Sequence, residues 1–413
     1  MARLIIVGAG AAGLFAAGSA LGAGHGVTLV EHMAAPGKKL AITGKGRCNL
    51  TNACEPAEFL KNVRSNPRFL TSAIHRLPPA DVMRLFEGEL GLPLKTERGR
   101  RVFPQSDRAA DVVDALLSRA AGAKMVRGQA TRLLVEAGRA AGVQLADGRK
   151  LAADAVVVAT GGLSYPVAGS TGLGYKLAQQ AGHTIVPPVP SLVAMVERGN
   201  TAKQMAGLSL RNVGLRLYED DKQVFAEQGE MLFTHFGLSG PMVLSASAFL
   251  GDMAKHRYRV AIDLKPALDE AKLDARLQRD FTEMAGRNVA NCLDKLLPAS
   301  MRPVMLAAWG APPTQKVNQI TRAQRQQLLG LLKAFPIEIA ARGSLDHAVI
   351  TAGGVDVKQV NPKTMESRLL PGLYFAGEVL DVDAYTGGYN LHTAWCTANA
   401  VADCLLSKYS QSS

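Results

Sequence analysis

The first 31 residues contain the pattern that most restricts the fold of this chain. A short apolar run, Arg3–Val7, leads directly into residues 8–13, GAGAAG, which form a GxGxxG motif. An alanine- and leucine-rich segment follows to about Gly22, and a second apolar run, residues 27–30, ends at Glu31. This order predicts a strand, a glycine turn, a helix and a second parallel strand, which together begin a Rossmann-like α/β domain.

The residues of this motif suit a bound dinucleotide. Gly8 permits a tight turn, Gly10 lets the backbone approach a pyrophosphate, and Gly13 lets the helix pack closely against the strand. The backbone N–H groups at the helix start, Ala11-Ala12 among them, attract phosphate oxygens. Glu31 can accept hydrogen bonds from the adenosine ribose, and its charge disfavours the 2′-phosphate of NADP. An ordinary glycine-rich turn does not account for Glu31, so we predict a site for FAD or NAD.

A second motif near the C-terminus decides between the two dinucleotides. Residues 372–378, GLYFAGE, read as a strand followed by an acid, which can approach a ribityl chain. Residues 387–390, GGYN, then form a tight turn, with Asn390 as the N-cap of a helix that runs to about Leu406. The positive end of that helix can stabilise an anionic reduced flavin. NAD dehydrogenases lack this pairing, so we predict FAD, bound non-covalently because no attachment motif is present. The candidate contacts here are Gly377, Glu378, Gly388, Tyr389 and Asn390.

A basic loop after the second strand is expected to lie beside the same cofactor. Residues 36–52 read PGKKLAITGKGRCNLTN, and Lys39, Arg47 and Asn49 are candidate contacts for the pyrophosphate or the flavin. Cys48 stands among basic neighbours that would stabilise a thiolate, so it is a candidate proton donor or redox thiol. The alternative interpretation of Cys48 is a small buried apolar residue.

The middle of the chain returns to the dinucleotide sheet. Residues 151–160, LAADAVVVAT, are predicted to form a buried strand that ends in Thr160 and Gly161-Gly162, near the pyrophosphate or the adenine. Residues 125–145 alternate as short strands, as in the small meander that covers such sheets. Ala130 in this meander is a further candidate contact for the cofactor.

The chain length predicts two or three domains. Residues 1–190 and 345–413 form the discontinuous FAD-binding domain. Short alternating apolar runs predict a β-barrel-like insertion over residues 191–266. Residues from about 334 to 344 are predicted to belong to the same domain. Helical periodicity predicts a small helical insertion over residues 267–333. The fold class is therefore α/β, a Rossmann-like FAD-binding domain with an inserted β-barrel-like domain and a small helical domain.

Composition restricts the partners and the compartment. The net charge of +12 favours a polyanion, whether nucleic acid, anionic lipid or a phosphorylated substrate, although FAD is itself an anion. The five cysteines are scattered, so we expect neither a disulfide framework nor a metal site, and a reducing cytoplasm fits. No apolar stretch is long enough to span a bilayer. We expect neither a membrane nor DNA as a partner, and the sequence does not define an oligomeric state.

Segments along nearly the whole chain resemble one family, the BaiN-like bacterial flavoproteins, also described as the aminoacetone-oxidase family of FAD-binding enzymes. The resemblance implies the three-domain arrangement above and redox chemistry on FAD. Members of this family are associated with reduction of steroid-type enones, with amine oxidation and with dihydrouridine formation in ribosomal RNA. The segments that carry the resemblance are GAGAAGL at Gly8, GKGRCNLTN at Gly44, RVFPQSDRAADVVDAL at Arg101, GSTGLGYKLAQQAGHTI at Gly169, MLFTHFGLSGP at Met231, and ITAGGVDVKQVNPKTMESRLLPGLYFAGEVLDVDAYTGGYNL at Ile350.

The resemblance and the charge together favour an FAD-dependent oxidoreductase that reduces a C=C bond, with uridine of ribosomal RNA as substrate and NAD(P)H as electron donor. Hydride would pass from flavin N5 to C6 of an extruded uracil, and a proton would pass to C5. Two alternatives remain open: a small-molecule enone reductase or amine oxidase, and a non-enzymatic flavin-bearing RNA-binding or sensor protein. The candidate proton donors are Cys48, then Tyr385, Tyr389 and His392.

Overall fold

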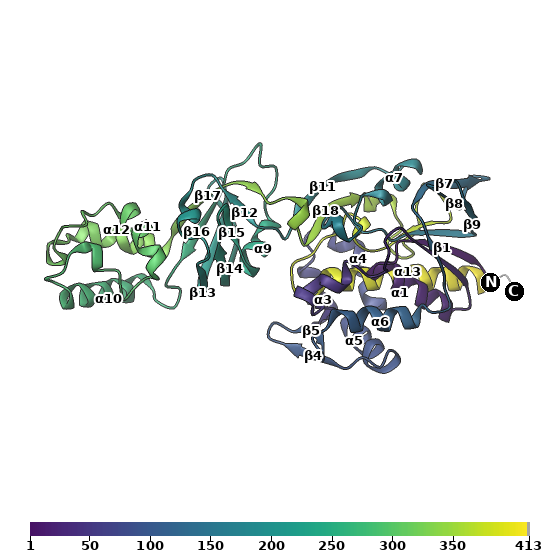
Figure 1. The fold of residues 1–413 in the computed structure, drawn as a ribbon, viewed down its shortest axis with the longest axis horizontal. Coiled ribbons are helices and arrows are strands. Elements are labelled where there is room, and N and C mark those ends of the chain that lie inside the picture. Colours follow the sequence, from purple (N-terminus) through teal and green to yellow (C-terminus); the bar gives the residue numbers. More distant parts are fainter. Residues whose placement is uncertain (411–413) are drawn as a thin grey trace. The chain divides into compact units, whose positions relative to one another are not determined.

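The computed structural model describes residues 1–410, which divide into two compact units (Figure 1). The first unit combines Met1–Ser191 with the chain from Leu345 onward, and the second is the intervening segment Leu192–Ser344. The second unit is therefore an insertion into the first.

The first unit is built on a five-stranded parallel sheet, which confirms the Rossmann-like fold. Apolar residues fill the strands because such a sheet is covered on both faces. The strand order is β19 (Leu373–Phe375), β10 (Ala155–Val158), β1 (Arg3–Val7), β2 (Gly26–Glu31) and β6 (Lys124–Arg127).

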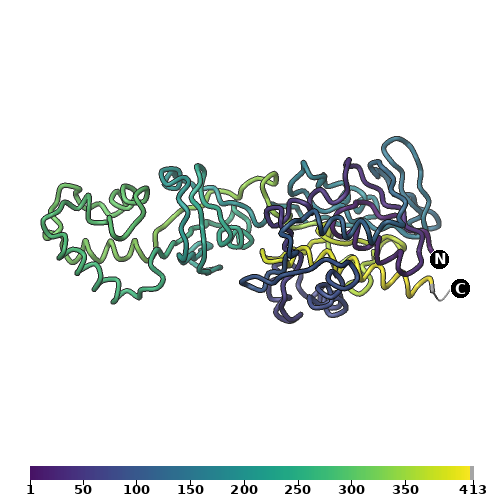
Figure 2. The backbone as a smooth tube through the Cα atoms, turned by 60° about the horizontal axis from the view of Figure 1, so that its bottom comes forward, coloured from purple at the N-terminus to yellow at the C-terminus, as the bar shows by residue number. Residues whose placement is uncertain are grey.

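Two helices from opposite ends of the chain pack together beside this sheet. Helix α1 (Ala11–Gly22) follows the glycine turn, and the C-terminal helix α13 (Tyr389–Ser410) lies against it (Figure 2). The rings of Phe15 and Trp395 are 5.5 Å apart at this contact. The prediction that α1 ends at Gly22 is confirmed, whereas α13 continues four residues past the predicted end at Leu406.

The strand predicted over residues 151–160 is interrupted. Its first part is β9 (Lys150–Ala152), which pairs with the meander, and its second part is β10 in the parallel sheet. Asp154 lies between them and accepts a hydrogen bond from the Arg3 backbone N–H at 2.7 Å. The continuous prediction was wrong because an apolar run does not show that the chain changes sheets at its centre.

Smaller elements surround the parallel sheet. Three antiparallel sheets comprise the meander β7 (Ala130–Glu136), β8 (Arg139–Leu145) and β9; the sheet β3 (Thr51–Asn52), β5 (Arg101–Pro104) and β4 (Leu94–Glu97); and the pair β11 (Ile185–Ser191) and β18 (Ile350–Val355). The remaining α-helices are α2 (Thr43–Gly46), α3 (Pro56–Lys61), α4 (Pro67–Arg76), α5 (Pro79–Arg84), α6 (Ala109–Arg119) and α7 (Leu173–Gln180).

The second unit contains a closed antiparallel barrel, which confirms the predicted barrel-like insertion. Closure pairs every strand edge. Helices α10 (Glu270–Glu283), α11 (Arg302–Trp309) and α12 (Arg322–Lys333) share one apolar core with the barrel. The Leu264 N–H donates to Leu332 O at 2.9 Å where barrel and helices meet. The strand order is β12 (Met195–Glu197), β15 (Gly237–Ser239), β14 (Lys222–Phe233), β13 (Ser209–Glu219), β16 (Tyr258–Asp263) and β17 (Phe335–Arg342). The helices are α8 (Thr201–Gln204), α9 (Pro241–Ser247), α10 (Glu270–Glu283), α11 (Arg302–Trp309) and α12 (Arg322–Lys333).

Candidate functional site

The three glycines of the N-terminal turn have different surroundings. Gly8 has a φ of +102°, and a Cβ there would lie 2.6 Å from Ala159 O. A Cβ on Gly13 would lie 1.8 Å from Gly8 O, so packing excludes any side chain at both positions. A Cβ on Gly10 would have no atom within 4 Å, and no side chain caps the start of α1. The turn therefore leaves open space in front of uncapped helix N–H groups, as an anion requires.

Glu31 is held beside this turn. Its Oε2 accepts a hydrogen bond from the Ala9 N–H at 2.8 Å, and its Oε1 accepts one from the Met33 N–H at 2.7 Å. The Gly128 N–H donates to Glu31 O at 2.9 Å, so the chain that leads to the buried residue Ala130 passes beside the same acid. An ionised carboxylate has further lone pairs, so Glu31 retains the capacity to accept from ribose hydroxyls.

Lys39 and Glu378, predicted separately as cofactor contacts, pair with each other. Lys39 Nζ lies 2.8 Å from Glu378 Oε2 and 2.7 Å from Ser164 Oγ. The Ser164 hydroxyl and the Thr351 N–H both donate to Glu378 Oε1 at 2.9 Å. The sequence interpretation missed Ser164 and Thr351, although each stands beside a pair of glycines, GGLS and VITAGG.

Further glycines allow segments from the two ends of the chain to approach each other closely. Gly377 has a φ of +77°, and a Cβ there would lie 2.8 Å from the Ala12 Cβ. Gly161 has a φ of +70°, and a Cβ on Gly162 would lie 2.5 Å from Thr351 Oγ1. The structure therefore brings together the N-terminal turn, the end of β10 and the segment after β19.

The Thr160 side chain packs against α7. Its Oγ1 is buried without a hydrogen-bond partner in the described chain, and a Cβ on Gly174 would lie 2.1 Å from that oxygen. The Thr160 side chain thus packs against the first turn of α7, and only the backbone after it continues toward the glycine segment. Asn49 also has a buried oxygen, Oδ1, that lacks a partner within residues 1–410.

Arg47 is not free to bind a phosphate. Its Nε donates to Asp107 Oδ1 at 2.7 Å, its guanidinium also pairs with Glu97, and it lies 4.2 Å above the centre of the Phe103 ring. Two carboxylates and a ring already occupy the guanidinium. Because the guanidinium is already paired, the structure does not support Arg47 as a cofactor contact. The sequence did not reveal these pairs, because the two acidic partners lie 50 and 60 positions away along the chain.

The structure contradicts the candidate role of Cys48 as a thiolate. The Cys48 side chain is completely buried, and desolvation raises the pKa of its thiol to about 12. Of the basic neighbours in sequence, Lys45 is exposed and Arg47 is paired with acids. The alternative interpretation, a small buried apolar residue, describes Cys48 correctly.

The glycine turn before α13 packs on strand β3. Gly388 has a φ of +99°, and a Cβ there would lie 2.3 Å from Thr51 O. Asn390 is not the N-cap, because the helix already begins at Tyr389. Its side chain instead accepts from the Ala384 N–H at 2.9 Å and donates to Ala384 O at 2.8 Å, which fixes the loop before the turn.

Two of the candidate proton donors near this turn are buried in their neutral forms. His392 Nε2 lies 2.9 Å from Leu77 O and must donate to it, so Nδ1 accepts from the Thr51 hydroxyl at 2.8 Å. Burial lowers the His392 pKa to about 4. Tyr389 packs on Phe59, and burial raises its pKa to about 12. Of the four candidates, including Cys48, Tyr385 alone has a partly exposed side chain.

An acid that the sequence interpretation missed lies just before this turn. Asp383 is 2% exposed, and its Oδ1 has no hydrogen-bond partner among the described residues. Burial raises the Asp383 pKa, and burial also raises that of Asp381, whose Oδ2 accepts from Asn66 Nδ2 at 2.9 Å. The signal was present as two acids in the sequence LDVD directly before the glycine turn.

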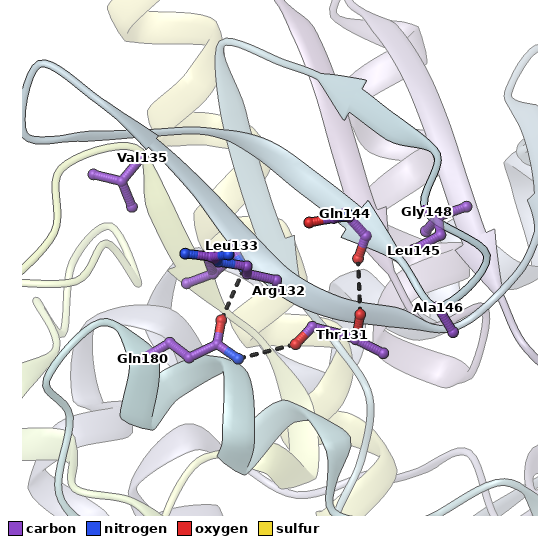
Figure 3. Close-up of a pocket in the computed structure, with 9 residues that line it drawn as sticks. All are labelled: Thr131, Arg132, Leu133, Val135, Gln144, Leu145, Ala146, Gly148 and Gln180. Atoms are coloured by element: carbon purple, nitrogen blue, oxygen red, sulfur yellow. Dashed lines mark hydrogen bonds between the residues drawn. The ribbon is translucent and has the colours of Figure 1, made fainter.

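A separate groove of about 770 Å³ lies over the meander and α7 (Figure 3). Among its lining residues, Gln180 accepts from the Leu133 N–H and donates to Thr131 O, each at 2.9 Å. None of the candidate cofactor or proton-donating residues lines this groove. Its lining is Thr131, Arg132, Leu133, Val135, Gln144, Leu145, Ala146, Gly148 and Gln180.

The fold and its relatives define the chain as an enzyme of the flavin-dependent oxidoreductase class. The family model described as HI0933-like protein Rossmann domain matches residues 2–404, and the chain belongs to this family. It is 32% identical over 406 residues to the ribosomal RNA dihydrouridine synthase of Escherichia coli K12, covering 97% of both chains. It is also 32% identical to the 3-dehydro-bile acid delta(4,6)-reductase of Clostridium scindens, covering 96% of this chain and 97% of the relative. The Haemophilus influenzae ribosomal RNA dihydrouridine synthase matches at 32%, covering 96% and 97%.

Solved structures show the same fold at low sequence identity. The 3-ketosteroid delta1-dehydrogenase of Sterolibacterium denitrificans matches with a TM-score of 0.53 at 13% identity, covering 98% of this chain and 99% of that chain. The 3-ketosteroid-delta4-(5alpha)-dehydrogenase of Rhodococcus jostii RHA1 has a TM-score of 0.51 at 13% identity, covering 97% and 96%. A flavocytochrome c3 fumarate reductase has a TM-score of 0.51 at 16% identity, covering 98% and 78%. Within residues 1–410, no helix is long and apolar enough to cross a membrane.

Proposed function

We propose that this chain binds FAD non-covalently and reduces the C=C bond of uridine in ribosomal RNA to give dihydrouridine, with NAD(P)H as the electron donor. The observation that carries the cofactor is the meeting of the two end motifs, where a Gly377 Cβ would touch the Ala12 Cβ at 2.8 Å. The substrate rests on two relatives named ribosomal RNA dihydrouridine synthase and on the net charge of +12.

The residues present fit FAD. The open space at Gly10 and the uncapped N–H groups of α1 would hold the pyrophosphate, and Glu31 would accept from the adenosine ribose. Lys39 and Glu378 would bind the ribityl chain. The Asn49 oxygen, which lacks a partner within the described chain, would gain one from the flavin edge.

When bound, reduced FAD would supply the hydride for C6 of the uracil. The chain orients the two partners, and the start of α13 stabilises negative charge placed before it. The proton for C5 must come from a group that substrate can reach. Tyr385 is our candidate, because its side chain is partly exposed, whereas Cys48, Tyr389 and His392 are buried. The base must leave its stack to enter such a site, which favours a single-stranded segment of cytoplasmic ribosomal RNA.

A second candidate function is reduction of a small enone. The Clostridium scindens relative, named as a bile acid reductase, has the same 32% identity as the two RNA-modifying relatives. Hydride addition to an enone and to a uracil is the same two-electron chemistry, so identity at this level does not separate the two substrates.

The decisive experiment mixes the reduced protein with each substrate under anaerobic conditions. The purified protein is reduced with NADH or NADPH, and ribosomal RNA from a strain that lacks the gene is then added. Reoxidation of the flavin, together with new dihydrouridine detected by mass spectrometry, is the expected result. Reoxidation by an enone with no response to the RNA would establish the small-molecule reductase instead. A protein purified without flavin that cannot be loaded with FAD would reject the cofactor.

A further inference from the structure

The hairpin of β4 and β5 carries three exposed arginines at its tip. The strands pair from Leu94 with Pro104 to Glu97 with Arg101, and residues 98–100 form the turn. Arg98, Arg100 and Arg101 are all exposed there. Strand β5 also pairs with β3, so the hairpin is one part of a three-stranded sheet and its tip has a fixed place.

Two acids of this region, Glu97 beside the turn and Asp107 after β5, already pair with other cations. Glu97 pairs with Arg47, and Asp107 pairs with both Arg47 and Lys95. Arg47 and Lys95 therefore both have carboxylate partners. The three arginines of the tip have two acids near them, Glu97 and Glu58, and Glu97 is shared with Arg47, so the local charge at the tip stays positive.

The arginines of the tip are free or weakly held. Arg98 has no ion pair within the described chain, and the one acid near Arg101 is Glu97, at 3.7 Å. Arg100 pairs with Glu58, and the two side chains are 56% and 48% exposed. An ion pair this exposed contributes little, so Arg100 can exchange Glu58 for a phosphate at small cost.

One side chain ties this tip to the glycine turn before α13. Asn52 Nδ2 donates to Gly99 O at 3.0 Å and to Gly387 O at 3.1 Å. The Ala53 N–H also donates to Arg100 O at 2.8 Å. The Asn52 amide therefore links the backbone of the tip to the turn that we assign to the flavin site.

We propose that Arg98, Arg100 and Arg101 bind phosphates of the RNA strand that flanks the target uridine. This inference rests on the proposed function, because it names the surface by which that site receives its RNA. A guanidinium binds phosphate oxygens in a bidentate manner, and such contacts position a strand without reading its sequence. In this arrangement the hairpin sets the distance between the RNA strand and the glycine turn, and the proposed flavin site accepts the uracil base.

The test measures RNA binding separately from turnover. A fluorescently labelled single-stranded oligouridylate is titrated with the full-length, flavin-loaded protein, and its anisotropy is followed at several salt concentrations. We expect Arg98→Gln/Arg101→Gln to weaken binding by roughly tenfold at low salt and to reduce the salt dependence by about one unit per arginine. Arg98→Lys/Arg101→Lys keeps the charge and should retain most of the binding. Arg132→Gln, an exposed arginine on β7, is the matched control and should bind like the wild type.

The opposite results overturn the inference. The inference fails if the Gln double variant binds RNA as tightly as the wild type. It also fails if Arg279→Gln, on α10, weakens RNA binding while the hairpin variant does not. An unchanged flavin spectrum and melting temperature show that the hairpin variant is folded. Dihydrouridine formation by wild type is measured in parallel. If the wild type forms dihydrouridine but the hairpin variant binds RNA normally, only the role of the hairpin is rejected. If the hairpin variant loses RNA binding but the wild type forms no dihydrouridine, the proposed reaction is rejected.

Discussion

Lys39 Nζ lies 2.8 Å from Glu378 Oε2, although 339 positions separate the two residues in the chain. The pair joins the loop after β2 to the segment after β19, and Ser164 Oγ hydrogen-bonds to both side chains. Both partners are less than a quarter exposed. The two halves of the discontinuous unit are therefore linked electrostatically at the place where we assign the ribityl chain.

Glu378→Gln should lower the free energy of unfolding by about 1–3 kcal/mol, because it leaves the partly buried Lys39 ammonium without its counter-charge. Chemical denaturation followed by far-UV circular dichroism measures this value. Lys38→Met, at the exposed neighbouring lysine, is the control and should change stability by less than about 0.5 kcal/mol. A Lys39→Met/Glu378→Gln double variant that loses the sum of both single effects would show that the two residues do not interact.

Gly10→Ala should leave the protein folded but deprive it of flavin. The new methyl group meets no protein atom within 4 Å, yet it occupies the space that we assign to the pyrophosphate. We expect FAD affinity to fall by at least roughly tenfold, measured by flavin content and fluorescence titration. Gly22→Ala, at the other end of α1 and also in open space, should retain its flavin. Full flavin loading of Gly10→Ala would remove the pyrophosphate from this turn.

Cys48→Ala should retain turnover within about twofold, since a buried neutral thiol contributes packing and not acid catalysis. The wild-type protein should also resist alkylation of Cys48 at pH 8 until it is unfolded, because the thiol pKa is about 12 and the side chain is buried. Mass spectrometry of iodoacetamide-treated protein locates the modified cysteines. Rapid alkylation of native Cys48 together with a dead Ala variant would restore the thiolate hypothesis.

His392 should make the protein less stable in acid. Its pKa is about 4 in the folded protein, whereas the ordinary pKa of a histidine is 6.5, so between these values the unfolded chain binds a proton that the folded chain does not. The free energy of unfolding therefore falls as the pH drops from 6.5 to 4, by about 3 kcal/mol in total for this group. His392→Gln should show a shallower loss over this window in denaturation at a series of pH values, whereas Cys48→Ala should follow the wild type. Parallel curves for His392→Gln and the wild type would contradict the assignment.

Local patterns in the sequence predicted the elements that depend on neighbouring residues. The strand Arg3–Val7, the glycine turn and the helix to Gly22 all occur as expected, since spacing and backbone freedom decide them. Side-chain partners were predicted less well. Arg47 was expected to contact phosphate and instead pairs with Glu97, a contact between segments that sequence spacing does not reveal.

The pKa of a buried group likewise depends on the tertiary structure and not on its neighbours in sequence alone. The basic neighbours of Cys48 suggested a thiolate, but burial, which depends on the packing of the whole unit, dominates its pKa. The acids Asp381 and Asp383 are plain in the sequence, and only the surrounding structure shows that burial raises their pKa values.

By itself, the sequence determined the Rossmann-like and barrel-containing fold class, because periodicity and glycine spacing act over short stretches of chain. The tertiary structure decided which distant residues meet: Lys39 with Glu378, Gly377 with Ala12, and Asn52 with both the hairpin tip and Gly387. It also decided which titratable groups lose their water. The physical reason is that hydrogen bonds, ion pairs and desolvation depend on distances in space, which the order of residues along the chain does not specify.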